Sequence, residues 1–427
     1  MATKLLLLAT LLSVLVSVAV GQGSRTRLSE AQQCRLQGLS ASQPSQRIES
    51  EGGTTELWNE NEDQFRCAGV APMRNTLRPN GLSLPNFHPS PRLVYIERGQ
   101  GLISISYPGC AETFHSEQSS RSQEGRHEEE QQQGRRRRDQ HQKVHRIRKG
   151  DIVALPAGAA HWCFNDGNEE LVAISITDLN HQANQLDQRL RAFYLAGRPP
   201  RQGQHSQQQA QESFQNIFNA FDEELMAEAF NIPVDLVKKM QREDERGLIV
   251  NAREMMSLIR PDENDENEEE EGKASNGLEE TLCTMRIHQN IDNRRQADVY
   301  ARQAGSLSIV NQHKLPILRY MDLSAEKGNL LPNALYTPHW SMRSHSIVYV
   351  LRGEAQVQVV GSNGQTVMND RTSGSPMKSP LAGYTSVFRA MPLDVITNSY
   401  QMSPNEAQDL KLNRGGQTFL LSPRMRS

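Results

Sequence analysis

The spacing of apolar residues predicts a chain built mainly from short β-strands. From Thr55 onward, apolar runs of four or five residues alternate with Gly, Pro and Asn, as at Leu93–Ile96, Gly101–Ile105 and Asp151–Leu155. Short runs of β-forming residues bounded by turn residues are typical of strands. A succession of such strands favours an all-β fold, either an antiparallel sandwich or a barrel.

Two later segments have helical spacing instead. Between Glu212 and Phe230, apolar residues recur three or four positions apart, which predicts one amphipathic helix. Pro233 is expected to start a second short helix that continues through Met240. These helices, at about 212–242, are expected to use their apolar stripes for core contacts or for a subunit interface.

The chain also repeats itself. Residues Leu93–Gly101 match Ile347–Ala355 without a gap, Leu195–Gly197 recurs as Leu381–Gly383, and Phe218–Phe230 aligns with Phe388–Tyr400. In the second copy, Ser403–Glu406 has the cap, proline and glutamate of a helix start. The repeat predicts two strand-then-helix domains, with the first barrel at about 45–180.

The two copies differ in length between matching positions. Ninety-five residues separate Gly99 from Leu195, whereas 27 separate Gly353 from Leu381. The second copy has no counterpart of Gly150–Pro156 or of the strands around it. A barrel without several strands leaves edges unpaired and its core open. We therefore expect the second barrel to be incomplete.

The N-terminus has the features of a secretory leader. Residues 1–21 contain a basic Lys4, an apolar run and small residues before Gln22, and this run is short for a membrane anchor. No membrane association is expected. In an oxidising compartment, the five cysteines at 34, 67, 110, 163 and 283 allow two disulfides and one spare thiol.

Charge and composition divide the chain near its middle. Residues 277–427 contain 16 Lys and Arg and 11 Asp and Glu, so this half is basic. Residues 1–276 contain the other 31 Lys and Arg and 39 Asp and Glu, so that half is acidic. Thirty-seven Arg and 36 Gln suit a nitrogen reserve, although low complexity in two polar tracts also explains part of this bias. An acidic linker at about 261–276 ends at Asn276 and Gly277, which form either an exposed processing site or an ordinary turn.

The polar tract at about 117–142 is expected to be a disordered surface loop. It contains Arg135–Arg138, and a run of arginines raises the possibility of nucleic-acid binding. The neighbouring acidic residues and the lack of interleaved aromatic residues argue against that function, so no nucleic-acid partner is expected.

One candidate site for chemistry spans the third predicted strand, Asp151–Leu155, and the turn after it. Gly150, Pro156, Gly158, His161 and Asn165 have the spacing of the second signature motif of the cupin β-barrels, in which the histidine can bind a metal. The positions expected for the remaining ligands hold Pro85, Phe87 and Arg92, and those of the second copy hold His339, Ser341 and Ser346. No catalytic, metal or cofactor site is therefore expected.

Two further expectations follow from these residues. His161 is expected to be a packed or surface residue, and Cys163, between Trp162 and Phe164 on a predicted barrel strand, is expected to be a buried free thiol. The alternative function is a secreted metal-dependent cupin enzyme of an oxalate-metabolising or isomerase type. Stoichiometric metal in the purified protein would favour that alternative.

Nearly the whole chain resembles the 11S seed storage globulins, or legumins. The resemblance rests on Asn276–Glu280 followed by Cys283, on Pro108–Phe114, Asn184–Asp187, Phe193–Gly197, Ala297–Tyr300 and Leu315–Arg319. It implies two cupin (jelly-roll β-barrel) domains and a nutrient-reservoir function. It also implies a precursor that enters the secretory pathway, forms homo- or hetero-oligomeric trimers with other 11S subunits, and reaches the protein storage vacuole of the seed.

The same resemblance assigns the processing residues. It implies that an asparaginyl endopeptidase cuts between Asn276 and Gly277, before hexamers form, into an acidic chain (22–276) and a basic chain (277–427). It pairs Cys110 with Cys283 across the cut and Cys34 with Cys67 within the acidic chain, which leaves Cys163. The sequence departs from the family between Arg371 and Thr372, where a turn and two or three strands are missing, so this form is expected to assemble poorly.

Overall fold

The computed structural model describes residues 39–107, 110, 114–115, 140–197, 214–241, 246–252, 283, 285–341, 344–360, 364, 366–371, 378–380, 403–405, 408 and 420–421. The predicted leader, Cys34, most of the polar tract, the acidic linker and the bond between Asn276 and Gly277 lie outside these residues. No helix in the described part of the chain is long and apolar enough to cross a membrane.

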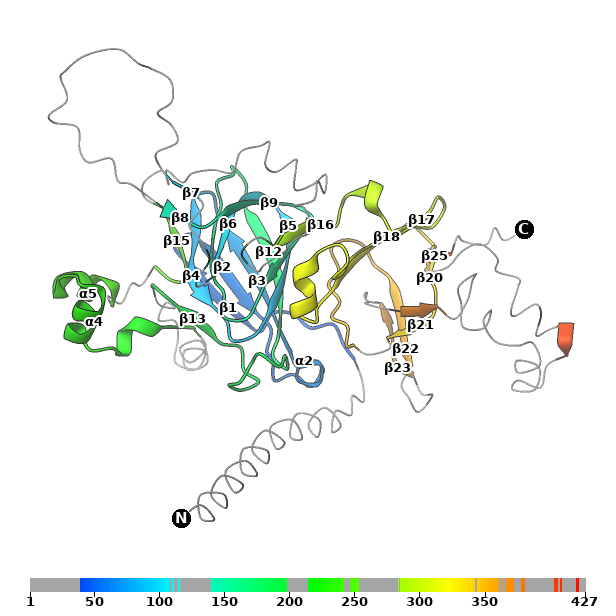
Figure 1. Cartoon of the computed structure of the whole chain (residues 1–427). Coiled ribbons are helices and arrows are strands. Elements are labelled where there is room, and N and C mark those ends of the chain that lie inside the picture. Colours follow the sequence, from blue (N-terminus) through cyan, green and yellow to red (C-terminus); the bar gives the residue numbers. More distant parts are fainter. Residues whose placement is uncertain are drawn as a thin grey trace, which may run out of the picture.

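Two seven-stranded sheets form the first barrel, at the centre of Figure 1. The first sheet is antiparallel throughout, and its order is β1 (Gln46–Ser50), β2 (Gly53–Leu57), β3 (Val70–Leu77), β12 (Leu171–Asp178), β5 (Arg92–Arg98), β10 (Asp151–Leu155) and β16 (His288–Asn290). A short helix, α2 (Asp63–Ala68), connects β2 to β3.

The order of the second sheet is β14 (Phe214–Asn216), β13 (Ala192–Tyr194), β4 (Gly81–Phe87), β11 (Ala160–Phe164), β6 (Gln100–Ser106) and β9 (Val144–Arg148), and β15 (Ile249–Asn251) also pairs with β4. Strands β7 (Phe114–His115) and β8 (Gln140–His141) form a separate pair, so the predicted loop at 117–142 extended too far at its C-terminal end.

The predicted strands at Leu93–Ile96, Gly101–Ile105 and Asp151–Leu155 are confirmed as parts of β5, β6 and β10. The barrel itself extends beyond its predicted end at about residue 180, because β13, β14, β15 and β16 all belong to its sheets. Those four strands have only three residues each, which is too short for an apolar period to be recognised in the sequence.

The single helix predicted at Glu212–Phe230 was wrong. Phe214 lies in β14, which pairs in parallel with β13, and it is followed by the 3₁₀ turn η1 (Ile217–Ala220) and by the helix α4 (Glu223–Phe230). The Asp222 side chain accepts a hydrogen bond from the Leu225 backbone N–H at 2.9 Å and caps α4 there. Burial of Phe214 against Tyr194 favoured the strand over the helical period.

The predicted second helix is confirmed as α5 (Val234–Met240), with Pro233 as its N-cap. In Figure 1, α4 and α5 lie beside the barrel, beyond β13. Met226, Ala227 and Val237 are buried between the two helices, whereas Phe221, Leu225, Phe230 and Leu236 are exposed. Part of the predicted apolar stripe therefore forms a small local core, and part remains at the surface.

The second half has smaller sheets in the part that the structure describes. After η2 (Arg294–Gln296) come three antiparallel strands, β17 (Val299–Ala301), β18 (Gly305–Val310) and β19 (Ala325–Leu330), with η3 (Pro316–Tyr320) between the last two. The remaining strands form pairs: β20 (Leu335–Tyr336) with β25 (Leu420–Leu421), β21 (His339–Ser341) with β24 (Lys378–Pro380), and β22 (Gln356–Val360) with β23 (Thr366–Arg371).

The segment of the second half that repeats the sequence of β5, residues 346–352, shows the effect of the missing strands. In the first half, Val94 and Ile96 are 9% and 1% exposed, because β5 pairs with β10 and β12 and faces the core. Their counterparts Val348 and Val350 are 37% and 45% exposed, and residues 347–350 form no strand. The described second half therefore leaves open the face that is internal in the first.

The turn after this segment gives independent evidence of the same loss. Gly99 and its repeat counterpart Gly353 have similar positive φ angles of 81° and 86°. A Cβ atom on Gly99 would lie 2.5 Å from the backbone oxygen of Glu170, just before β12, whereas one on Gly353 would meet no described residue within 4 Å. The second half thus keeps the turn, and its described residues include no strand packed against that turn as β12 is in the first half.

Candidate functional site

The residues of the cupin-like motif have structural roles around the turn from β10 to β11. Gly150 and Gly158 have φ angles of 91° and 76°, which favour glycine. The Gly158 backbone N–H donates to the His88 carbonyl oxygen at 2.7 Å. The Asn165 amide donates to the carbonyl oxygens of Leu77 and Glu169 at 2.9 and 2.8 Å. The motif therefore ties β11 to neighbouring loops and strands.

His161 lies on β11, is buried, and stacks on the ring of His88 with 5.9 Å between ring centroids. Arg92 adjoins the pair, with its Nη2 atom 3.1 Å from Nδ1 of His88. Arg92 also donates from Nε to Oγ1 of Thr177 at 3.0 Å. Two buried histidines and a buried arginine thus lie together in the first barrel, at the end of its strands where β5 begins.

Burial controls the charge of this cluster. It lowers the pKa of Arg92 to about 10, so the guanidinium remains charged at neutral pH. Burial, together with the positive charge of Arg92, lowers the pKa of His161 to about 4 and holds that of His88 well below its ordinary value. Both imidazoles are therefore neutral at pH 7, beside a permanent positive charge.

The positions that should complete a metal site do not supply ligands. Phe87 stacks on Phe193 with a centroid distance of 5.2 Å, and Arg92 brings a cation to the place where a carboxylate was required. In the second half, Nδ1 of His339 lies 2.6 Å from the Thr337 carbonyl oxygen, and Ser346 is exposed. Among the described residues, no three His, Cys, Asp or Glu side chains gather in a way that could hold a metal ion.

A disulfide joins Cys110 to Cys283, which are 173 residues apart in the sequence. This is the bond that the resemblance implied across the expected cut. Cys67 is also disulfide-bonded, and its implied partner, Cys34, lies outside the described residues. Cys163 is a partly buried free thiol on β11. Burial and the nearby Asp166 raise its pKa to about 12, so the unreactive thiol form dominates at neutral pH.

The segment after Cys283 is part of the first barrel. Strand β16 pairs with β10, and its neighbours Met285, Ile287 and Ile291 belong to the same buried cluster as Val153 and Leu155. The backbone N–H of Ala154 also donates to the Ile287 carbonyl oxygen at 2.8 Å. Sequence analysis missed this contribution, because His288–Asn290 has no apolar alternation to mark it as a strand.

Equivalent tyrosines of the two copies each form a hydrogen bond with a residue of the other half of the chain. Tyr95, on β5, accepts a hydrogen bond from Nζ of Lys327 at 2.6 Å, and the same ammonium pairs with Asp292 at 2.5 Å. Tyr349, the repeat counterpart of Tyr95, donates to Oε2 of Glu97 at 3.1 Å. The duplicated tyrosine is therefore used twice in contacts between the first and the second half.

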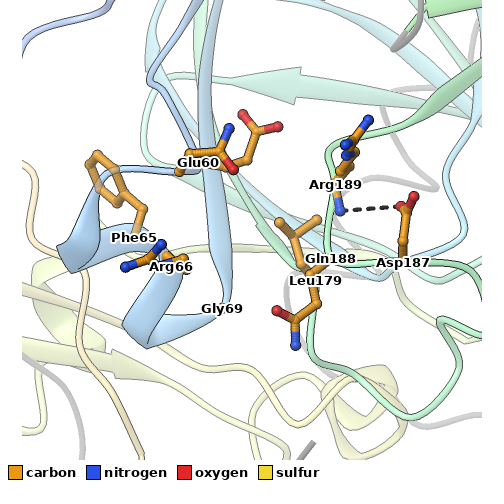
Figure 2. A pocket seen from close by; sticks show the side chains of 9 residues that line it. Glu60, Phe65, Arg66, Gly69, Leu179, Asp187, Gln188 and Arg189 are labelled. Carbon is orange, nitrogen blue, oxygen red and sulfur yellow. Dashed lines mark hydrogen bonds between the residues drawn. The ribbon is translucent and has the colours of Figure 1, made fainter. Parts of the chain in front are cut away.

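A depression of about 220 Å³ beside α2 is shown in Figure 2. Phe65 and Leu179 contribute apolar surface, and the backbone N–H of Arg189 donates to Oδ1 of Asp187 at 3.3 Å. Ligand sites usually have volumes of roughly 300 to 1,000 Å³. The other residues that line the depression are Glu60, Asn61, Arg66, Gly69 and Gln188. Its volume is below the usual range for a ligand site.

Comparison with known proteins gives the family. Residues 39–201 and 289–374 match the family model described as Cupin. The chain is 60% identical over 449 residues to 11S globulin seed storage protein 2 of Sesamum indicum, covering 98% of this chain and 98% of the relative. The chain belongs to the 11S globulin family of seed storage proteins.

Other 11S globulins agree in sequence and in structure. The chain is 41% identical over 444 residues to 11S globulin seed storage protein Ana o 2.0101 of Anacardium occidentale, covering 93% of this chain and 94% of the relative. The crystal structure of the coconut allergen cocosin superposes with a TM-score of 0.77 at 36% identity, covering 92% of this chain and all of that one. The expected two-domain cupin fold is thereby confirmed.

The alignment with the sesame 11S globulin also bears on the missing strands. It spans 449 positions, although the present chain has only 427 residues, so the relative carries positions that this chain lacks. This agrees with the shortened second copy. In the first barrel, Gly150 and Gly158 form turns, and Asn165 forms hydrogen bonds to the backbone.

The buried His161 is expected to make this 11S globulin sensitive to acid. In the unfolded chain a histidine has a pKa near 6.5, whereas that of folded His161 is about 4. Between these values the unfolded state binds more protons, so stability falls as the pH falls, by up to roughly 3 kcal/mol. Replacing His161→Gln should reduce the difference between the urea midpoints at pH 7 and pH 4.5.

The exposed His313 provides the control for this measurement. His313→Gln should retain the full difference between the two midpoints. An equal difference in the His161→Gln variant and the unaltered protein would show that other groups cause the acid sensitivity.

Proposed function

We propose that this 11S globulin is a nutrient reservoir, stored as two chains after a cut between Asn276 and Gly277. The disulfide between Cys110 and Cys283 carries the two-chain proposal, because it would connect an acidic chain, 22–276, to a basic chain, 277–427. The storage function rests on the family, and the 37 arginines and 36 glutamines suit a nitrogen reserve.

The geometry around Arg92 supports storage over the alternative metal-dependent enzyme. An arginine takes the position of a required carboxylate ligand, and the neighbouring histidines stack on one another. A positive guanidinium at that position repels a divalent cation. The motif residues that remain in this barrel hold turns and loops in place.

Electrophoresis of seed extract tests the two-chain organisation. Without reductant the protein is expected to migrate as one species, and with reductant as a larger acidic and a smaller basic chain. Asn276→Gln should prevent the cut, so that the precursor stays as a single band even after reduction. The measurement is the band pattern under denaturing conditions, with and without reductant.

The chain offers a matched control for this variant. Asn363 is also followed by a glycine, Gly364. Asn363→Gln should leave the two-band pattern unchanged. Normal cleavage of the Asn276→Gln variant would overturn the assignment of the processing site.

The proposal extends to the cellular route and to assembly. A secretory leader at 1–21, delivery to the protein storage vacuole and cleavage there by an asparaginyl endopeptidase would explain the expected cut. Association with other 11S subunits, as in a trimer, requires apolar surface for subunit contacts, whereas the open second barrel of this chain is expected to prevent stable hexamers. The exposed Phe221, Leu225, Phe230 and Leu236 on and beside α4 and α5 supply a candidate surface.

A further inference from the structure

A single glutamine side chain holds the turn that ends at Cys110, one of the two cysteines of the disulfide. The Cys110 backbone N–H donates to the carbonyl oxygen of Tyr107 at 3.2 Å. The Gln142 amide oxygen accepts from the Tyr107 backbone N–H at 2.8 Å, and the amide nitrogen donates to the carbonyl oxygens of Tyr107 and Cys110 at 2.8 and 3.0 Å. Gln142 therefore binds both ends of this turn.

The two cysteines are each connected to the same core. Tyr107 packs against the large buried cluster of the first barrel, and Met285 is a buried member of that cluster. Met285 is two residues from Cys283, so packing restrains the backbone on that side of the disulfide. Cys110 is three residues from Tyr107, and the hydrogen bonds of Gln142 fix this longer connection.

The chain returns to the disulfide immediately before Gln142. Strand β7 begins four residues after Cys110 and pairs with β8, and Gln142 directly follows β8. Because the polar tract lies between β7 and β8 in the sequence, the bonds of Gln142 connect its two ends next to the disulfide.

The disulfide is accessible to exchange in the folded protein. Cys283 is exposed and Cys110 is partly buried, and their Cα atoms are 5.4 Å apart. How readily the bond is reduced depends on how close the two thiols stay in the reduced chain, because one thiolate must attack a mixed disulfide on the other to re-form the bond. Ordering the backbone of one more residue changes such an equilibrium by about tenfold.

We propose that Gln142 is a positioning residue for the disulfide between Cys110 and Cys283. Its three hydrogen bonds keep the Cys110 thiol within reach of Cys283 in the reduced, folded chain, which makes the bond harder to reduce. In the exchange with glutathione, the two protein thiols are oxidised to one disulfide while glutathione disulfide is reduced to two molecules of glutathione. This role applies to the uncut chain, so it does not depend on the cut at Asn276.

Equilibration of the uncut, full-length protein with reduced and oxidised glutathione tests the proposal. Alkylation of the free thiols, followed by digestion and mass spectrometry, gives the fraction of Cys110 and Cys283 in the disulfide. Gln142→Ala removes all three hydrogen bonds and is expected to shift the equilibrium about tenfold toward the dithiol, which raises the reduction potential by about 30 mV. An unchanged equilibrium would overturn the proposal.

The reduction potential separates positioning from general stabilisation. A side chain that only stabilises the fold would stabilise the oxidised and the reduced protein equally, and its loss would leave the potential unchanged. Gln241, at the end of α5, is the matched control, because its amide nitrogen donates to the carbonyl oxygens of Phe218 and Phe221 at 2.9 and 2.7 Å. Gln241→Ala should leave the equilibrium unchanged, and a shift equal to that of Gln142→Ala would contradict the proposal.

Gln142→Glu provides a second variant with a side chain of nearly the same volume. It keeps an acceptor for the Tyr107 N–H, but it lacks both N–H donors and turns a carboxylate oxygen toward the carbonyl oxygens of Tyr107 and Cys110. It should therefore shift the equilibrium at least as far as Gln142→Ala, and its result decides if the alanine variant does not fold.

A shortened polar tract completes the test. Replacing residues 117–138 by a short turn should leave the equilibrium unchanged, because the bonds of Gln142 remain. A shift in this variant, without one in Gln142→Glu, would show that the tract positions Cys110 and would overturn the role of Gln142.

Discussion

Sedimentation of the purified protein is expected to show no stable hexamer. The second half exposes Val348 and Val350, whose counterparts in the first half are core residues. An open apolar face favours irregular association over closed symmetric assembly. We therefore expect monomers together with polydisperse aggregates that increase with protein concentration, as measured by analytical ultracentrifugation.

Restoring the missing segment is the matched control for this result. A variant that carries the corresponding segment of the sesame 11S globulin between Arg371 and Thr372 should close the second barrel. It should sediment as a discrete oligomer under conditions in which the unaltered chain does not. Stable hexamers of normal size from the unaltered chain would refute the predicted assembly defect.

Reduction without denaturant is expected to leave the two processed chains together. After a cut at Asn276, β16 would still pair with β10, and Ile287 would still be buried in the core of the first barrel. The disulfide between Cys110 and Cys283 would then be one connection among many. Gel filtration of the cut protein in reductant should give one peak that contains both chains, whereas reductant with urea should separate them.

Substitutions in the basic chain test whether burial of the segment around β16 holds the two chains together. Ile287→Asp would bury a charge among apolar residues and should destabilise this contact by several kcal/mol, so that reductant alone releases the basic chain. Leu330 is exposed on the same chain, and Leu330→Asp should leave the chains associated. Release of the basic chain from the unaltered protein by reductant alone would show that the disulfide holds the chains together.

Several features could be predicted from local sequence because their causes are local. The strand segments near Val94, Ile103 and Val153 have apolar residues bounded by turns, and α5 begins immediately after Pro233. The shortened second copy could be detected because the repeat aligns without a gap through Gly353. The replacement of a carboxylate by Arg92 was also visible, and it argued against a metal site before the structure was known.

Other features depend on contacts between distant residues. Helical spacing at Phe214 was misleading because pairing with β13 and burial against Tyr194 stabilise a strand there. Strand β16 has a polar sequence, and only its register with β10 makes it part of the first barrel. No pattern near residue 288 could indicate a partner more than a hundred residues earlier.

The sequence by itself determined the family, the duplicated barrel architecture and the loss within the second copy, because each leaves a direct record in the order of residues. The tertiary structure decided which strands complete the first barrel and which apolar residues are exposed in the second half. It also showed that the guanidinium of Arg92 is buried without a carboxylate partner among the described residues. Pairing, burial and charge balance depend on residues brought together from across the chain, and local spacing does not contain that information.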